Sequence, residues 1–268
     1  MIVTGARPAG VEDEAQAARA VQQMFDSIAP RYDLLNHVLS ASVDRLWWRQ
    51  TARKFRAILA DPDAAVLDVC CGTGHMTRAL LKGRPRDARP ILAMDFAREM
   101  LSRGARRFGA QRFKSRDSAS SAHAPFAVAI EADALHLPLR SASLDLIVTA
   151  FGFRNLANYE SGLREFARVL KPGAQLGILD FAEPGGLMGK AYAVYFRRVL
   201  PVIGRLLSGP AAAGQSGPYS YLPASVGKFP PPPEMLTLMG ATGYTDCKWQ
   251  PYTFGIAGLY TGVRGAER

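Results

Sequence analysis

The sequence predicts one α/β domain built on a mostly parallel β-sheet with helices on both faces. Short β-rich runs alternate with helical patterns between residues 64 and 181, which is the order that strand–helix–strand units require. Nearly half of the 268 residues (48%) are apolar, so the chain can bury a sizeable core.

The chain before the first strand has the periodicity of helices. Apolar residues recur at helical spacing through residues 14–59, with a break expected at Ala29-Pro30. We therefore expect an N-terminal helical cap over residues 1–60 and a main domain over residues 61–268, together forming one structural unit.

Strands and helices then follow in order. The expected strands are AAVLDVC, PILAMD, PFAVAIEAD, SLDLIVTAFG and AQLGILDF. The expected helices between them are HMTRALLK, FAREMLSRGARRF and YESGLREFARVL, the last closed by KPG. After a helical insertion over about residues 185–230, EMLTLMGAT predicts a further helix, and YTDCKWQPYTF and GLYTGVR predict two final strands of the sheet.

The bulk composition restricts the partners and the location. The net charge is +10, and the region from Lys82 to Arg116 holds eleven basic against three acidic residues, which we interpret as solvated surface loops. An anionic membrane is a candidate partner, whereas no nucleic acid is expected because aromatic residues that stack on bases are missing beside this region. Without an apolar signal segment or a stretch of about eighteen apolar residues, we expect a cytoplasmic protein. The three cysteines lack the spacing of a disulfide framework or a zinc site, so no metal is expected.

Glycines and acids stand at the ends of three successive strands. Gly72-Thr73-Gly74 follows the first strand, where glycines let a ligand approach the main chain and the next helix offers free N–H groups. Asp95 ends the second strand, placed to accept both hydroxyls of a ribose, and Asp133 follows the third, placed to accept from an amino group such as that of adenine. They predict an adenosine ligand at the carboxyl edge of the sheet. Since the motifs for dinucleotides and nucleoside triphosphates are missing, S-adenosylmethionine remains.

Cys70 and Cys71 directly precede the glycine turn. Adjacent cysteines are poorly placed to ligate one metal or to close an unstrained disulfide. We interpret them as small apolar residues packed at the strand end, close to the cofactor and not reacting.

Several segments together resemble one known family. They are FDSIAPRYDLLNHVLS, VLDVCCGTG, MDFAREML, ADALHLPL, FGFRNLANYESGLREFARVLKPG and YSYLPASVGKFP. These segments are similar to the motifs of the ubiquinone/menaquinone biosynthesis C-methyltransferases, and the resemblance covers about residues 20–264. It implies the Rossmann-like class I methyltransferase fold with seven strands and S-adenosylmethionine as cofactor. The cofactor contacts that it implies come from Asp68, Gly72, Thr73, Gly74, Asp95, Asp133 and Ala134. His75 departs from the family, where an acidic residue is usual.

The resemblance also implies a reaction. A methyl group would pass to a ring carbon of a reduced polyprenyl quinone precursor, and the Cys-Cys pair looks most like the branch that converts demethylmenaquinol to menaquinol. A benzoquinol of the ubiquinone pathway, or both rings, stays open as an alternative, and a nucleic-acid methyltransferase is disfavoured. Arg154 is expected to hold the developing oxyanion or an activating water, with Asn155 orienting it, and a salt bridge that fixes the loop is the alternative role for Arg154. Tyr32, with Asp33 and Asn36, is expected to cover the pocket or contact the substrate.

The isoprenoid tail of such a polyprenyl quinol requires apolar surface. Residues 187–207, with Tyr219 and Tyr221, are expected to line a channel for the tail and to rest on a membrane, which would place the protein at the inner face of the cell membrane. The alternative is a helix pair that covers the sheet or forms the contact of a homodimer.

Overall fold

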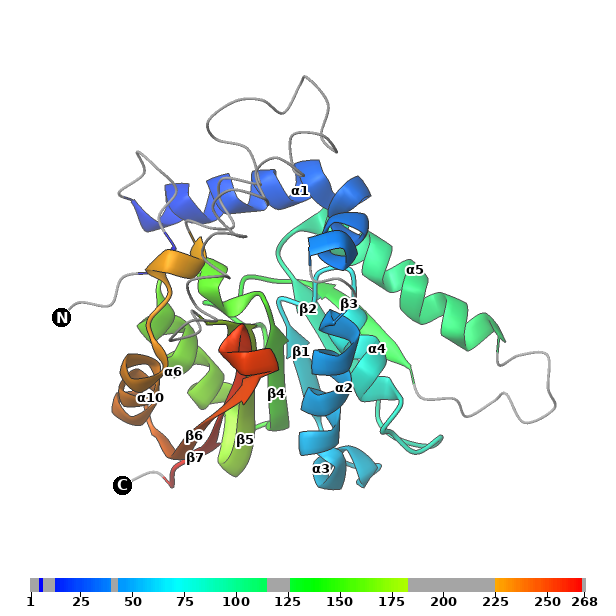
Figure 1. The fold of residues 1–268 in the computed structure, drawn as a ribbon. Helices are drawn as coiled ribbons and strands as arrows, with labels where there is room; N and C mark the ends of the chain where they lie inside the picture. Colours follow the sequence, from blue (N-terminus) through cyan, green and yellow to red (C-terminus); the bar gives the residue numbers. More distant parts are fainter. Residues whose placement is uncertain (1–4, 7–12, 40–42, 115–125, 183–224, 267–268) are drawn as a thin grey trace, which may run out of the picture.

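The computed structural model describes residues 5–6, 13–39, 43–114, 126–182 and 225–266 of the chain (Figure 1). Its seven strands form one sheet in the order β3-β2-β1-β4-β5-β7-β6. They are β1 (Val66–Val69), β2 (Ile91–Asp95), β3 (Ala127–Glu131), β4 (Leu144–Ala150), β5 (Leu170–Phe181), β6 (Tyr244–Tyr252) and β7 (Ala257–Arg264). All neighbouring strands are parallel except β7, which runs antiparallel to β5 and to β6. The predicted seven-stranded, mostly parallel sheet is confirmed.

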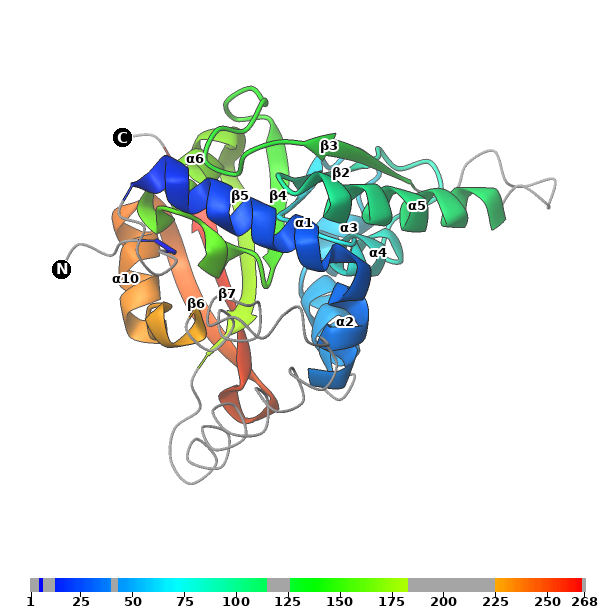
Figure 2. The same cartoon turned by 90° about the horizontal axis from the view of Figure 1, so that it is seen from above.

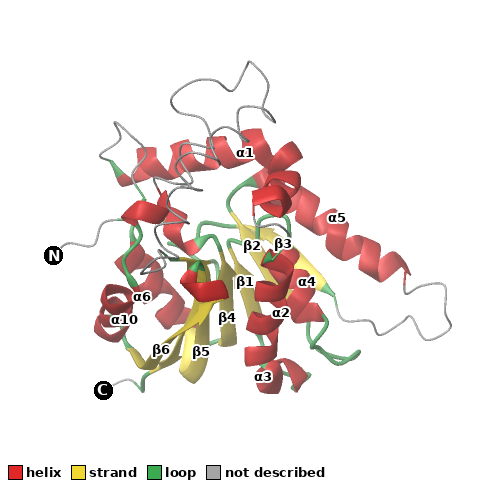
Figure 3. Cartoon of the chain, in the orientation of Figure 1, coloured by secondary structure: helices red, strands yellow, loops and turns green. Residues whose placement is uncertain are grey.

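Helices cover both faces of this sheet (Figure 3). One face carries α2 (Asp44–Lys54), α3 (Arg56–Ala60), α4 (His75–Leu81) and α5 (Arg98–Lys114), and the other carries α6 (Tyr159–Val169) and α10 (Pro232–Ala241). The remaining long helix, α1 (Glu14–Leu39), lies across the carboxyl ends of the strands (Figures 1 and 2). It therefore covers the edge at which the sequence predicts the ligand.

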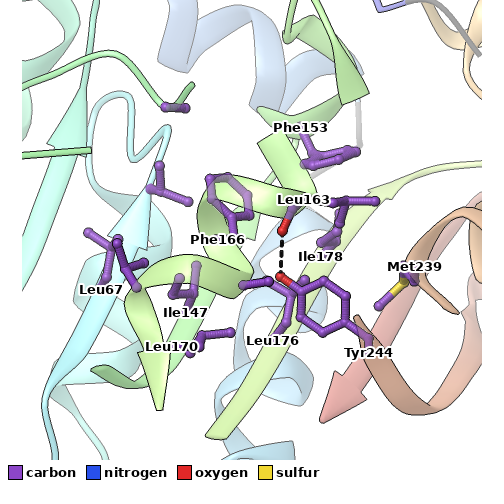
Figure 4. Close-up of a cluster of buried hydrophobic side chains, with 14 of the residues drawn as sticks. Leu67, Ile147, Phe153, Leu163, Phe166, Leu170, Leu176, Ile178, Met239 and Tyr244 are labelled. Atoms are coloured by element: carbon purple, nitrogen blue, oxygen red, sulfur yellow. Dashed lines mark hydrogen bonds between the residues drawn. The ribbon is translucent and has the colours of Figure 1, made fainter. Parts of the chain in front are cut away.

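The larger core cluster lies between the sheet and the helices α6 and α10 (Figure 4). Phe166 of α6 and Met239 of α10 are fully buried against it. Tyr244 brings a hydroxyl into this apolar layer and donates it to the carbonyl oxygen of Leu163 at 2.9 Å. A buried hydroxyl with an acceptor avoids the cost of desolvating an unpaired polar group.

Two predicted boundaries are wrong. Helix α1 runs through Ala29-Pro30 without the expected break, although a proline inside a helix removes one hydrogen-bond donor. The KPG segment belongs to β5, which begins at Leu170 directly after α6. The pairing of β4 with β5 shifts there from Leu144 opposite Leu170 to Leu146 opposite Gln175. Extra residues that bulge out of a ladder accommodate a proline and the left-handed Gly173 inside one strand.

The segment 183–224 lies outside the described residues. The predicted tail channel, with residues 187–207, Tyr219 and Tyr221, falls within it, as does most of the predicted insertion at about 185–230. Residues 115–125, which include Arg116 at the end of the basic region, are likewise outside the described part. None of the helices in the described part of the chain is long and apolar enough to cross a bilayer.

Candidate active site

A pocket lies at the carboxyl ends of β1 and β4, under α1. It holds about 710 Å³ of empty space, open solvent at its mouth included. The neighbours β1 and β4 are the strands at which the chain reverses direction across the sheet, because α4 after β1 and α6 after β4 lie on opposite faces. Open α/β sheets bind ligands at this switch point. The pocket therefore lies at the edge of the sheet where the sequence predicts the ligand.

The two glycines of the turn after β1 are required for different structural reasons. Gly72 lines the pocket with a φ of +52°, and a Cβ built on it would meet no atom within 4 Å. The space beside its main chain is open to a ligand. Gly74 begins α4 in the left-handed conformation, with a φ of +80°, and a Cβ there would overlap the ring of Phe108. Thr73 between them is buried, and its carbonyl oxygen accepts a hydrogen bond from Arg107.

Asp95 joins the end of β2 to this turn. One carboxylate oxygen accepts the main-chain N–H of Gly72 at 2.7 Å, and the other accepts the N–H of Ala97 at 2.8 Å. The carboxylate also lines the pocket. Burial raises the pKa of Asp95 to about 6, although the main-chain hydrogen bonds act against this rise. A buried, backbone-held carboxylate with remaining lone pairs fits the ribose hydroxyls that the sequence predicts here.

Asp68 lies in β1 below the pocket and is fully buried. One of its carboxylate oxygens accepts the hydroxyl of Thr77, and the other has no hydrogen-bond partner within the described residues. Desolvation raises the pKa of Asp68 to about 7, with the hydrogen bond from Thr77 acting against it and the charge of Asp95 adding to it. A buried acid held beside the glycine turn fits a ligand that carries positive charge, as S-adenosylmethionine does.

Asp133 and Ala134 follow β3 and line the same pocket. Asp133 accepts the N–H of Leu135 at 2.9 Å and lies 3.1 Å from the Nδ1 atom of His136. Its side chain is half exposed (51%). Three apolar residues of the wall, Phe25, Phe96 and Met100, were not predicted as part of the site. Their only sequence signal is helical spacing, with Phe25 on the apolar face of α1 and Met100 four residues after Phe96.

Arg154 and Asn155 are placed differently by the short 3-10 helix η2 (Phe153–Asn155) that follows β4. Asn155 lines the pocket, and Arg154 does not. The guanidinium of Arg154 forms a buried ion pair with Asp180 at 2.8 Å and lies over the ring of Phe181. Asp180 also accepts the main-chain N–H of Arg154 at 3.1 Å. Asp180 was not predicted as a site residue, because its only signal in the sequence is an acid within the apolar run GILDF.

The cysteines and His75 occupy structural positions. Cys71 packs in an apolar cluster with Leu101, while Cys70 forms part of the pocket wall. Burial raises the pKa of both thiols well above the usual range, so both stay protonated. The ring of His75 stacks on Trp48, with centroids 4.5 Å apart. His75 thus joins the start of α4 to α2.

The helix α1 closes the pocket from above through Ala18 and Phe25. Its Gln22 donates to the carbonyl oxygen of Phe96 at 2.6 Å, and its Asp26 accepts the N–H of Glu99 at 3.0 Å. Tyr32 belongs to the same helix, but its side chain is outside the described part of the structure. The predicted role of Tyr32 therefore stays a prediction.

Taken together, Gly72, Asp95, Asp133, Ala134 and Asn155 meet in one pocket, with Asp68 beneath it. This sheet and this set of strand ends define a class I methyltransferase that uses S-adenosylmethionine. Residues 12–264 match the ubiE/COQ5 methyltransferase family, and the chain belongs to that family.

Similar proteins agree with this assignment. The demethylmenaquinone methyltransferase of Deinococcus radiodurans is 43% identical to this chain, over 94% of the chain and 95% of the relative. The ubiquinone/menaquinone biosynthesis C-methyltransferase UbiE of Geobacter sulfurreducens is 37% identical, over 92% of the chain and 89% of the relative. A crystal structure of an S-adenosylmethionine-dependent methyltransferase from Thermotoga maritima has a TM-score of 0.58 at 15% identity, over 91% of this chain and 99% of that one. At this low identity the structural likeness supports the fold alone.

Proposed function

We propose that this protein methylates a ring carbon of demethylmenaquinol, a naphthoquinol with a polyprenyl tail, to give menaquinol. The observation that carries the proposal is the pocket itself. The residues suited to the adenosine part of the cofactor share one cavity with Asn155 and with the apolar side chains of Phe151 and Leu156. A cavity of this mixed character suits a polar methyl donor and an apolar aromatic acceptor side by side.

S-adenosylmethionine supplies a methyl group on a sulfonium, which is already a good leaving group. The main task of the chain is therefore to align the acceptor carbon with that methyl group and to exclude water, and such alignment can supply roughly 7–11 kcal/mol. We assign the ribose hydroxyls to Asp95 and the adenine amino group to Asp133. In the balanced reaction, the sulfur–methyl bond of the donor would break with its electron pair left on sulfur, giving S-adenosylhomocysteine. The ring carbon would form the new carbon–carbon bond and lose its hydrogen as a proton.

The acceptor carbon becomes strongly nucleophilic when the neighbouring quinol hydroxyl loses its proton, so the oxyanion needs a donor. We assign this role to the side-chain amide of Asn155, a residue of the pocket wall whose Nδ2 also donates to the carbonyl oxygen of Phe151 at 3.3 Å. Arg154 would act by holding the η2 turn through Asp180, because its guanidinium bonds Asp180 and the carbonyl oxygen of Phe151. The predicted direct contact of Arg154 with the oxyanion stays a prediction.

Methyl transfer from labelled S-adenosylmethionine tests the proposal. Purified protein is offered chemically reduced demethylmenaquinone and, in parallel, the demethylated ubiquinol precursor, and the products are identified by mass. Turnover of the naphthoquinol alone is expected. If neither quinol is methylated while the cofactor still binds, the proposed substrate class is wrong.

The ubiquinone-type benzoquinol is the second candidate, since the name of the Geobacter sulfurreducens relative includes both pathways. Turnover of both quinols in the same assay would establish a dual-specificity enzyme. Either substrate carries an isoprenoid tail and resides in a bilayer, so we also propose that the protein works at the inner face of the cell membrane.

A further inference from the structure

One aromatic side chain projects from the carboxyl edge of the sheet. Phe254 lies in η5 (Thr253–Gly255), the short red helix between β6 and β7 in Figure 1, and is 78% exposed. Its φ of +57° is in the left-handed region, which is costly for a bulky side chain. Strained residues cluster at functional sites, so Phe254 is a candidate for function.

A second exposed apolar side chain belongs to the helix that is hydrogen-bonded to η5. Leu46 of α2 is 48% exposed. Its neighbour Trp47 donates its indole N–H to the hydroxyl of Thr253 at 2.8 Å, so α2 and η5 are fixed to each other. Phe254 stands at the carboxyl edge, because Ala257 after η5 pairs with Phe181 at the end of β5.

The same helix is strongly basic. Arg45, Arg49 and Arg53 are exposed and recur every fourth residue, so they lie along one side of α2. None of the three forms an ion pair with the described residues. The acid in this helix, Asp44, is buried. An excess of unneutralised positive charge around two protruding apolar side chains favours an anionic partner with an apolar interior.

Aromatic rings connect this face to the pocket. Phe151 lines the pocket, and its ring lies 4.6 Å from that of Phe181 and 5.8 Å from that of Trp47. Trp47 in turn holds Thr253, beside Phe254. An apolar path thus leads from the pocket wall toward the protruding side chains.

We propose that the face formed by Arg45, Leu46, Arg49, Arg53 and Phe254, the docking face, binds the surface of a bilayer that contains anionic phospholipid. Phe254 and Leu46 enter the acyl layer, and the arginines contact the phosphates. This inference rests on the proposed function for its choice of partner, because a polyprenyl quinol must be reached in a bilayer.

Sedimentation with vesicles tests the docking face. The full chain is mixed with vesicles of phosphatidylcholine, with and without about one third phosphatidylglycerol, at low and high salt. Preferential binding to the anionic vesicles, weakened by salt, is expected. Equal binding to both vesicle types, or no binding to either, would overturn the proposal.

Paired variants locate the contact. The first variant combines Phe254→Asn with Leu46→Gln, because asparagine tolerates a left-handed conformation and glutamine tolerates a helix. It should lower the vesicle partition coefficient about tenfold or more. Arg45→Glu with Arg49→Glu should do the same on anionic vesicles. The control, Arg86→Glu with Arg140→Glu, makes the same charge change at exposed positions outside the docking face and should bind as wild type. If the control lost vesicle binding equally, net charge alone would explain the effect, and the proposal would be wrong.

The two proposals can fail separately. Turnover of a short-tailed, water-soluble naphthoquinol needs no bilayer, so both docking variants should keep it within about twofold of wild type. Wild-type vesicle binding without turnover of any quinol would contradict the proposed function alone. Turnover of the soluble quinol together with unchanged vesicle binding by the docking variants would contradict the docking face alone.

Discussion

Replacement of Asp180 by asparagine is the sharpest test of how the site is built. Asp180 is fully buried and accepts three hydrogen bonds, from the guanidinium and the main chain of Arg154 and from the main chain of Phe181. Asp180→Asn preserves the size of the side chain but leaves the guanidinium buried without its countercharge. Breaking a buried pair in this way costs about 3–5 kcal/mol.

For a chain of this length, that loss lowers the melting temperature by roughly 6–20 °C, which calorimetry or circular dichroism would measure. Glu160→Gln is the matched control, because it removes a carboxylate from the exposed ion pair with Arg164. An exposed pair contributes about 1 kcal/mol or less, so this control should melt close to wild type.

The same variant separates positioning from cofactor binding. Because Asp180 holds the η2 turn, Asn155 should move within the pocket and kcat should fall by roughly 100-fold. The Kd of S-adenosylmethionine should change little, since Gly72 and Asp95 are held by their own hydrogen bond. If the Asp180→Asn protein has the melting temperature of wild type and keeps kcat within about twofold, the proposed positioning role of Asp180 is wrong.

Other expectations follow from the buried acids, the glycine turn and a buried arginine. Since burial raises the pKa of Asp68 to about 7 and of Asp95 to about 6, the folded protein holds protons that the unfolded chain releases, and its stability should fall as pH rises from about 4 to about 7. A positively charged cofactor favours the ionised acids, so its binding at about pH 6.5 should release protons, seen by titration calorimetry in two buffers, and Asp68→Asn should reduce the release. Gly74→Ala, at a φ of +80°, should cost about 1–3 kcal/mol in urea unfolding, whereas Gly240→Ala, where a Cβ meets nothing within 4 Å, should not destabilise. Arg84 donates to five main-chain carbonyl groups, so Arg84→Met should lower the free energy of unfolding by at least about 2 kcal/mol.

The strand ends could be predicted from the sequence because their signals are local. Gly72, Asp95 and Asp133 each follow an apolar run, and a parallel sheet brings such ends to one edge whatever the rest of the chain does. The residue types then specify the ligand class. This is why four of the seven predicted cofactor residues, Gly72, Asp95, Asp133 and Ala134, line the pocket.

The contacts between distant segments could not be predicted. Nothing near Arg154 in the sequence indicates that Asp180, in the next strand, forms an ion pair with its guanidinium. The hydrogen bond from Gln22 to Phe96 likewise depends on where α1 crosses the sheet, which no periodicity specifies. Pro30 shows the reverse case, because helix α1 continues through a residue whose local signal predicts a break.

The hydrogen bond from Gly72 to Asp95 has a consequence for anyone who would redesign the nucleoside preference of this pocket. The carboxylate that faces the ligand also fixes the chain that the ligand rests against. A change of side chain at position 95 therefore alters the conformation of the glycine turn as well as the chemistry of the site. A new specificity would first need another acceptor for the N–H of Gly72, and a loss of binding on its own would say nothing about the ribose.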